Sequence, residues 1–251
     1  MGDSCCKMQN ASDTQVNPDN IKQLVREHYG AAIEAESGCC TKQDAGSVPG
    51  ARSSFGCGDP LALLGLSPGQ TVLDLGSGPG LDAIEAAKRV SPGGSVIGVE
   101  MTEPMIAAAR RNAQTAGVDN VEFRNGDVDN LPVADATIDH VISNCVVNLV
   151  PDKKKVFSEI YRVLKPGGSF SITDLVGENL PADVLASAAS LCACIGGAPS
   201  EKEYMEAING AGFSPVDIVD RFRWDAPELQ GTDGIVWSLK ITARKPVART
   251  A

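Results

Sequence analysis

The sequence has little positive charge, no long apolar run and only two histidines. Its 251 residues carry 22 Lys and Arg against 32 Asp and Glu, for a formal net charge of −10. Nucleic-acid-binding proteins normally present a basic patch, so this balance argues against polyanionic partners and suits a small or cationic ligand. No apolar stretch approaches the roughly 18 residues of a membrane helix, and no charged-then-apolar leader is present. We expect a cytoplasmic protein without nucleic-acid or membrane partners.

The chain has eight cysteines, which is too few for a disulfide scaffold. In a reducing compartment they are expected to be thiols that serve packing, catalysis or metal binding. Six of them form close pairs, which are Cys5 with Cys6, Cys39 with Cys40, and Cys192 with Cys194. The other two, Cys57 and Cys145, are isolated.

Strand-like and helix-like segments alternate through the middle of the chain. This alternation with short turns predicts βαβ units and a parallel sheet, and therefore an α/β fold. The expected strands are Thr71–Leu75, Ser95–Glu100, Val121–Asn125, one within Thr137–Val147, and Ser169–Asp174. The expected helices are Leu81–Val90, Glu103–Ala116 and Asp152–Val163.

Three segments are expected. Residues 1–55 hold a helical and loop segment with one helix at Asp19–Glu36, and residues 56–178 hold the alternating domain. Residues 179–251 are expected to form a smaller α+β segment that closes over the sheet. Its expected helices are Ala182–Cys194 and Glu201–Ala211.

A glycine-rich loop, from Asp74 through Gly76, Ser77 and Gly78 to Gly80, follows the first strand and opens the first helix. Ligands in such folds bind outside the carboxyl ends of the strands. Glycine lets the backbone approach a ligand closely, since it has no side chain to block contact. On its own, such a loop is more often a plain turn than a nucleotide site.

Two carboxylates at neighbouring strand ends strengthen the nucleotide interpretation. Glu100 ends the second strand, where it can accept hydrogen bonds from ribose hydroxyls. Asp127 follows the third strand, where it can accept one from an adenine amino group. The glycine spacing is not that of a dinucleotide site, and Asp74 would repel a pyrophosphate. A sulfonium amino acid, which carries positive charge, suits Asp74.

Together these residues resemble the class I methyltransferases over roughly Gln70 to Asp174, and the run Arg162–Gly168 does so as well. The resemblance implies a Rossmann-like, doubly wound sheet and S-adenosylmethionine as the cofactor. The residues expected to bind it are Asp74, Gly76, Ser77, Gly78, Gly80, Glu100, Met101, Gly126, Asp127, Val128 and Asn144.

The sequence offers no obvious histidine or lysine base for the acceptor. His140 lies in an apolar strand context, which favours a packing role. Cys145 lies at the end of the fourth strand, where this fold faces the transferred methyl group. Taken alone, Cys145 is as well explained by core packing.

Longer stretches resemble the arsenite S-adenosylmethionine methyltransferases, over about residues 20 to 215. They are Tyr29-Gly30, Ser37–Cys40, Gly56–Pro60, Gly98–Thr102, Ile142–Leu149 and Cys194–Ala198. The resemblance implies that Cys57, Cys145 and Cys194 bind trivalent arsenic. It implies that Cys39 or Cys40 assists with inorganic arsenite and thiol–disulfide cycling. Phe55 stands where the family often has tyrosine, so we expect it only to pack.

The chemistry implied by this resemblance needs no general base. Trivalent arsenic is soft and prefers thiolate ligands, and its lone pair can attack the sulfonium methyl in line. The protein then has to position the arsenic and the methyl group and to exclude water from the site. We expect a monomer that methylates arsenicals for detoxification and takes a thiol reductant, glutathione or thioredoxin. The alternatives are a quinone-type methyltransferase and a non-catalytic, thiol-rich arsenic-binding protein.

Overall fold

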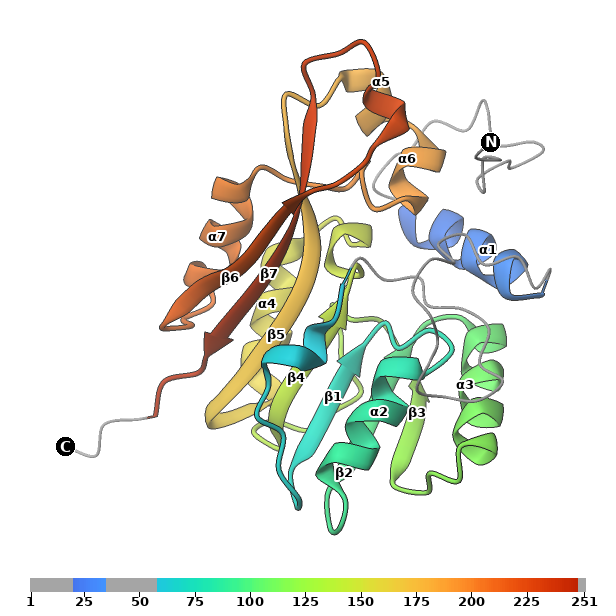
Figure 1. Ribbon diagram of the computed structural model, residues 1–251, viewed down its shortest axis with the longest axis vertical. Coiled ribbons are helices and arrows are strands. Elements are labelled where there is room, and N and C mark those ends of the chain that lie inside the picture. The colour runs from blue at the N-terminus through green and yellow to red at the C-terminus, as the bar shows by residue number, and fades with distance from the viewer. Residues whose placement is uncertain (1–19, 35–57, 248–251) are drawn as a thin grey trace.

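The computed structural model describes residues 20–34 and 58–247 of the chain (Figure 1). In this part, one seven-stranded sheet has the order β3-β2-β1-β4-β5-β7-β6. The strands are β1 (Thr71–Leu75), β2 (Ser95–Glu100), β3 (Val121–Asn125), β4 (Ile138–Asn144), β5 (Leu164–Glu178), β6 (Val216–Arg223) and β7 (Ile235–Arg244). β1 to β5 pair in parallel, and β7 is antiparallel to both β5 and β6. The predicted Rossmann-like α/β fold is confirmed.

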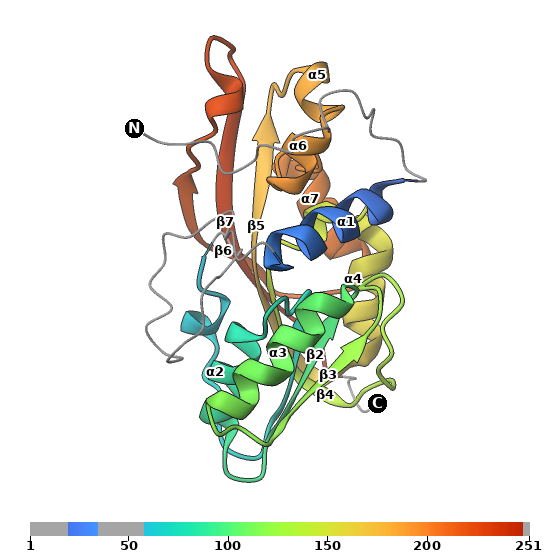
Figure 2. The same ribbon diagram turned by 90° about the vertical axis from the view of Figure 1, so that its right-hand side faces the viewer.

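Helices cover both faces of the sheet (Figures 1 and 2). They are α1 (Ile21–Glu34), α2 (Leu81–Val90), α3 (Glu103–Thr115), α4 (Lys153–Val163), α5 (Ala182–Leu185), α6 (Ala188–Cys192) and α7 (Glu201–Gly210). Single 3-10 turns are η1 (Pro60–Leu63), η2 (Val147–Leu149) and η3 (Pro227–Leu229). α2 and α3 share one buried apolar cluster with the sheet, and α4 and α7 share another. Because both faces are covered, the central strands are continuously buried, as in Val72 to Leu75 of β1.

The order of the strands reverses at β1, which lies between β2 and β4. In open α/β sheets this switch point is where ligands bind, outside the carboxyl ends of the strands. α1 crosses above α3 at this end of the sheet (Figures 1 and 2). The fold therefore places the loops after β1, β2 and β4 beneath α1.

One segment was predicted as a single helix but forms two. The segment Ala182–Cys194 forms two short helices, α5 and α6, rather than one. Ser187 between them is extended, and its side chain accepts a hydrogen bond from the backbone N–H of Ser190. This capping contact starts a new helix and explains the break.

The predicted fifth strand, Ser169–Asp174, is too short. β5 runs from Leu164 to Glu178 because β7 pairs with it from Ser169 to Glu178. Through β7, the C-terminal part of the chain extends the same sheet and adds Leu239 and Ile241 to its core.

The predicted helix Asp19–Glu36 is found as α1 over Ile21–Glu34, and residues 19, 35 and 36 lie outside the described residues. Among the helices that the structure describes, none has the length and apolarity needed to cross a membrane.

Candidate active site

A cavity lies at the carboxyl ends of the central strands, beneath α1. Its lining includes most of the predicted cofactor residues: Gly76, Ser77, Gly78, Glu100, Met101, Gly126, Asp127, Val128 and Asn144. Cys145 lines the same cavity. The structure therefore brings most of the predicted cofactor residues and one predicted arsenic ligand into one site. Asp74 and Gly80 lie outside its lining.

The loop after β1 depends on glycine for conformation and for space. Gly76, Gly78 and Gly80 have φ values of 62°, 49° and 84°, a region that side chains disfavour. A Cβ at Gly76 would lie 2.3 Å from Cγ2 of Val146. The loop can therefore approach the segment after β4 only because this position has no side chain.

Glu100 joins the loop after β1 to the end of β2. Its side chain is 8% exposed and accepts hydrogen bonds from the backbone N–H groups of Thr102, at 2.9 Å, and Gly78, at 3.2 Å. Burial raises the pKa of Glu100 above its ordinary value. The carboxylate is thus held in one orientation at the wall of the cavity.

Asp82 lines the same cavity, and Asp74 is buried close to Asp82 but outside the lining. Burial raises the pKa of Asp74 well above its usual range, and the charges of Asp82 and Glu100 raise it further. One oxygen of Asp74, Oδ2, is buried without a hydrogen-bond partner. Buried carboxylates with an unsatisfied acceptor fit a cationic ligand, such as the ammonium and sulfonium of S-adenosylmethionine. Asp82 was not predicted, although its place in the first turn of α2 could have indicated it.

Asp127 contacts α1, which the sequence did not predict. Lys22 Nζ lies 3.1 Å from Asp127 Oδ2 and 2.8 Å from Asp129 Oδ1, and Arg26 lies 3.6 Å from Asp127 Oδ1. The four-residue spacing of Lys22 and Arg26 puts both cations on one face of the helix and was the available signal. α1 is thereby fastened over the cavity by ion pairs.

Cys145 and Cys194 are both buried, each 3% exposed, and they contact each other. Both have positive φ values, 59° and 63°, which are uncommon for residues other than glycine. The Cys194 thiol donates to the Cys145 carbonyl oxygen at 3.0 Å. Cys145 is disulfide-bonded in the structure.

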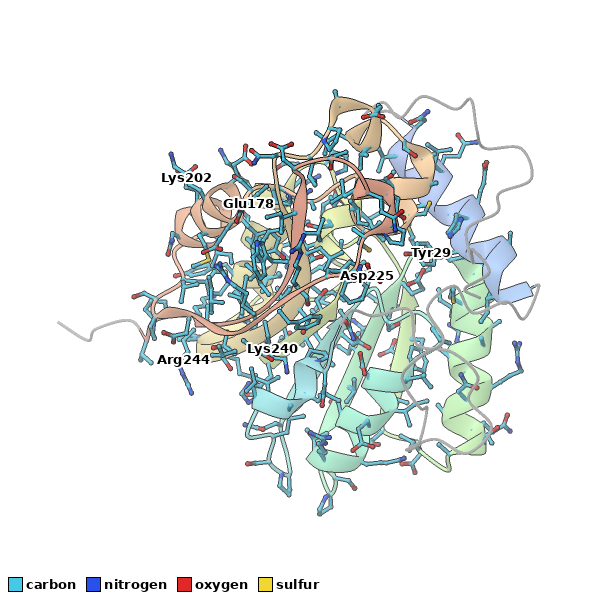
Figure 3. The ribbon with its side chains drawn as sticks, turned by 45° about the horizontal axis from the view of Figure 1, so that its top comes forward. Tyr29, Glu178, Lys202, Asp225, Lys240 and Arg244 are labelled. Atoms are coloured by element: carbon cyan, nitrogen blue, oxygen red, sulfur yellow. The ribbon has the colours of Figure 1, made fainter. Side chains whose placement is uncertain are left out.

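The neighbouring Cys192 is buried and contacts α1 through its backbone. The Tyr29 hydroxyl donates to the carbonyl oxygen of Cys192 at 2.9 Å. Figure 3 shows Tyr29 on the side of α1 that faces the body of the molecule. α1 therefore contacts both the cofactor side of the cavity and the segment that carries Cys194. Cys5, Cys6, Cys39, Cys40, Phe55 and Cys57 lie outside the described residues.

Asn144 links the end of β4 to the segment that begins at Gly58. Its Nδ2 donates to the Gly58 carbonyl at 2.7 Å and to Asp82 Oδ2 at 3.2 Å, and its Oδ1 accepts from the Gly58 N–H at 3.2 Å. This amide therefore contacts an acidic residue of the cavity and the backbone that directly follows Cys57 in sequence.

His140 lies away from this cavity. Its Nδ1 is 2.9 Å from the Ser169 hydroxyl oxygen, and burial lowers its pKa. No histidine is found in the lining contributed by residues 20–34 and 58–247, so the described site offers no imidazole base.

Comparison with known proteins agrees with this geometry. Residues 66–212 match the family model of a methyltransferase domain. Over 95% of its length, the chain is 39% identical to the arsenite methyltransferase of Halobacterium salinarum and covers 71% of that protein. The chain belongs to the arsenite methyltransferase family. It is also 35% identical to the arsenite methyltransferase of Aquipseudomonas alcaligenes, over 80% of this chain and 64% of that one.

Solved structures share this fold. An arsenic(III) S-adenosylmethionine methyltransferase from Chlamydomonas reinhardtii superposes with a TM-score of 0.69 at 31% identity. That match covers 91% of this chain and 75% of the other. A phosphoethanolamine N-methyltransferase of Haemonchus contortus, solved with S-adenosyl-L-methionine, shares the fold at 22% identity with a TM-score of 0.61. That match covers 74% of this chain and 52% of the other.

Proposed function

We propose that this arsenite methyltransferase transfers a methyl group from S-adenosylmethionine to trivalent arsenic held by cysteine sulfur. The observation that carries the proposal is the shared cavity. Glu100, Met101 and Asn144 line it together with Cys145, and Cys194 contacts the Cys145 backbone. A cationic methyl donor and a thiol-bound acceptor would therefore meet at the end of β4.

The acidic residues of the cavity would hold the donor. Asp74 and Asp82 would face its positive charges, Glu100 its ribose hydroxyls and Asp127 its adenine amino group. Asp127 is paired with Lys22, so the adenine would share this carboxylate with α1 or displace Lys22. The remaining predicted contacts are the backbone of the loop after β1 and Gly126, Met101, Val128 and Asn144. When bound, S-adenosylmethionine supplies the electrophilic methyl group.

The cysteines would hold the acceptor. Each thiol that replaces a hydroxyl of arsenite releases one water, so Cys57, Cys145 and Cys194 together would give a three-sulfur complex. The arsenic lone pair then serves as the nucleophile, and no side chain has to remove a proton. The protein positions the arsenic and excludes water.

The redox partner and the organisation of the chain belong to the same proposal. A thiol reductant, glutathione or thioredoxin, would reduce the Cys145 disulfide and restore oxidised cysteines. Cys39 or Cys40 would take part in that cycle. Residues 1–55 would form an N-terminal segment, 56–178 the cofactor-binding domain and 179–251 the segment that gates arsenic, in a cytoplasmic monomer that detoxifies arsenic.

A direct test measures S-adenosylhomocysteine formation by the purified, reduced chain. We expect formation to require arsenite and to be absent with a demethylated quinone. A demethylmenaquinone methyltransferase of Listeria welshimeri is 33% identical over 49% of this chain. The assay with the quinone therefore tests the alternative that the chain methylates a quinone. Turnover with the quinone alone would refute the proposal. Arsenite binding without turnover would favour a non-catalytic arsenic-binding protein.

A further inference from the structure

Asn148 is a buried polar residue that the mechanism above does not use. It lies in η2, three residues after Cys145, and is 1% exposed. Its side-chain amide donates to two backbone carbonyls, those of Leu175 at 2.7 Å and Cys194 at 3.2 Å. Leu175 belongs to β5, whereas Cys194 follows α6. One side chain therefore ties the carbonyl of Cys194 to the central sheet.

Cys194 needs such a restraint because its backbone is in the left-handed region, with φ at 63°. That conformation is unfavourable for a residue with a Cβ and persists only where surrounding contacts hold it. Two contacts restrain Cys194 relative to the segment that begins at Cys145. Asn148 holds the Cys194 carbonyl, and the Cys194 thiol donates to the Cys145 carbonyl. The orientation of the sulfur thus follows from the position of this backbone.

The backbone of Asn148 is itself fixed from two sides. Its N–H donates at 3.2 Å to Asp174 Oδ2, which also accepts from the Tyr204 hydroxyl at 3.1 Å. On the other side, a Cβ at Gly197 would lie 2.0 Å from the Asn148 carbonyl oxygen, so the loop after Cys194 packs directly on it. A rigid chain of contacts therefore runs from α7 through β5 to Cys194.

The remaining polar atom of Asn148 argues against a purely structural role. Its Oδ1 is buried without a hydrogen-bond partner, and an unsatisfied buried acceptor destabilises the fold. An apolar residue of the same size would avoid that cost but could not hold the Cys194 carbonyl. The asparagine is therefore better explained by what its two N–H groups position.

We propose that Asn148 is a positioning residue that aligns the Cys194 sulfur with Cys145 for capture of trivalent arsenic. This inference rests on the proposed function. If it is right, Asn148 acts on arsenic only through Cys194, and the effect of replacing it disappears when Cys194 is already lost.

The experiment is a double-mutant cycle on the dissociation constant of inorganic arsenite, measured with reduced protein. Arsenite is the probe because two of the three proposed sulfurs remain when Cys194 is replaced. In the wild-type background we expect Asn148→Leu and Asn148→Ala to weaken arsenite binding about tenfold, equivalent to one net hydrogen bond. In the Cys194→Ser background we expect a change below about twofold. Asn148→Leu is nearly isosteric and removes the unsatisfied acceptor, so it tests the idea even if Asn148→Ala fails to fold.

Asn120 provides a matched control. Its amide also donates to two backbone carbonyls, Ala87 at 2.9 Å and Gly94 at 3.0 Å, but at the opposite end of the sheet. We expect Asn120→Ala to lower the melting temperature and leave arsenite affinity unchanged. Equal losses for Asn148→Leu in both Cys194 backgrounds, or an equal loss for Asn120→Ala, would overturn the inference. A wild-type protein that binds arsenite but does not methylate it would refute the proposed activity and leave this cycle decisive for Asn148.

Discussion

Replacing Glu100 by glutamine isolates the charge of one cofactor contact. The Glu100 carboxylate is 8% exposed and accepts backbone hydrogen bonds from Gly78 and Thr102. Glutamine has the same size and keeps one acceptor oxygen, so much of this local structure can persist. Its amide cannot accept both ribose hydroxyls as a carboxylate can. The substitution therefore addresses binding of S-adenosylmethionine more than folding.

The expected magnitude follows from the kind of hydrogen bond that is lost. Bonds to a charged group contribute about 1.5–3 kcal/mol, compared with about 0.5–1.5 kcal/mol for neutral pairs. Over the ribose contacts the loss is about 1–3 kcal/mol, which is about a 5- to 150-fold increase in the Kd for S-adenosylmethionine. Glutamine can accept only one of the two backbone hydrogen bonds from Gly78 and Thr102, so we also expect a modest decrease in the melting temperature of the unliganded protein.

Calorimetric titration with S-adenosylmethionine and, separately, with arsenite checks this prediction. We expect Glu100→Gln to weaken only the first. Glu103 is the matched control, since it is exposed at the start of α3 and contacts Asn125. Glu103→Gln should change the cofactor Kd by less than about twofold. Unchanged cofactor affinity in a folded Glu100→Gln protein would refute the assignment of Glu100 to the ribose.

Three further predictions concern the thiols and a buried carboxyl group. Cys145→Ser should abolish arsenite methylation while circular dichroism stays that of the wild type, because a hydroxyl cannot hold arsenic as a thiolate does; wild-type turnover would remove Cys145 from the site. Methylarsenite has two exchangeable positions against three in arsenite, so product analysis should show that Cys57→Ser loses arsenite methylation but largely keeps methylarsenite methylation, whereas Cys194→Ser loses both. Equal loss of both activities in Cys57→Ser would contradict this division. Burial raises the pKa of Asp174 from 3.8 to about 6 in the folded protein. The folded state therefore binds the proton more tightly than the unfolded chain does. The resulting stabilisation is complete below pH 3.8 and is lost as the pH rises through about 6. Urea titrations should therefore show the stability of the wild type, relative to Asp174→Asn, falling by about 3 kcal/mol between about pH 3 and pH 7; a difference independent of pH would contradict the shifted pKa.

The features that the sequence predicted well depend on local pattern. β1 and the glycine loop after it combine a short apolar run with residues that permit positive φ. Glu100 could be placed because it ends a strand of defined length beside that loop. The carboxyl ends of parallel strands meet at one edge, so one-dimensional spacing was enough to bring these groups together.

The features that the sequence did not predict depend on distant contacts. The spacing of Lys22 and Arg26 puts both cations on one face of α1, but it does not identify the partners of Lys22, Asp127 and Asp129, which are more than a hundred residues away. The length of β5 is set by its pairing with β7, which no local pattern encodes. The sequence indicated that the segment with Cys194 closes over the sheet, but its pairing with Cys145 was expected only from the family resemblance. The residues after β4 and after α6 meet through distant contacts such as that of Asn148 with Cys194.

The central claim is that this chain moves a methyl group onto arsenic. The most direct measurement incubates the purified, reduced chain with arsenite and S-adenosylmethionine carrying a deuterated methyl group, then separates the arsenicals by chromatography with mass detection. The account predicts methylated arsenic that carries the deuterated methyl, in amounts equal to the S-adenosylhomocysteine formed per methyl transferred. Folded protein that binds both ligands and yields no labelled arsenical would contradict it.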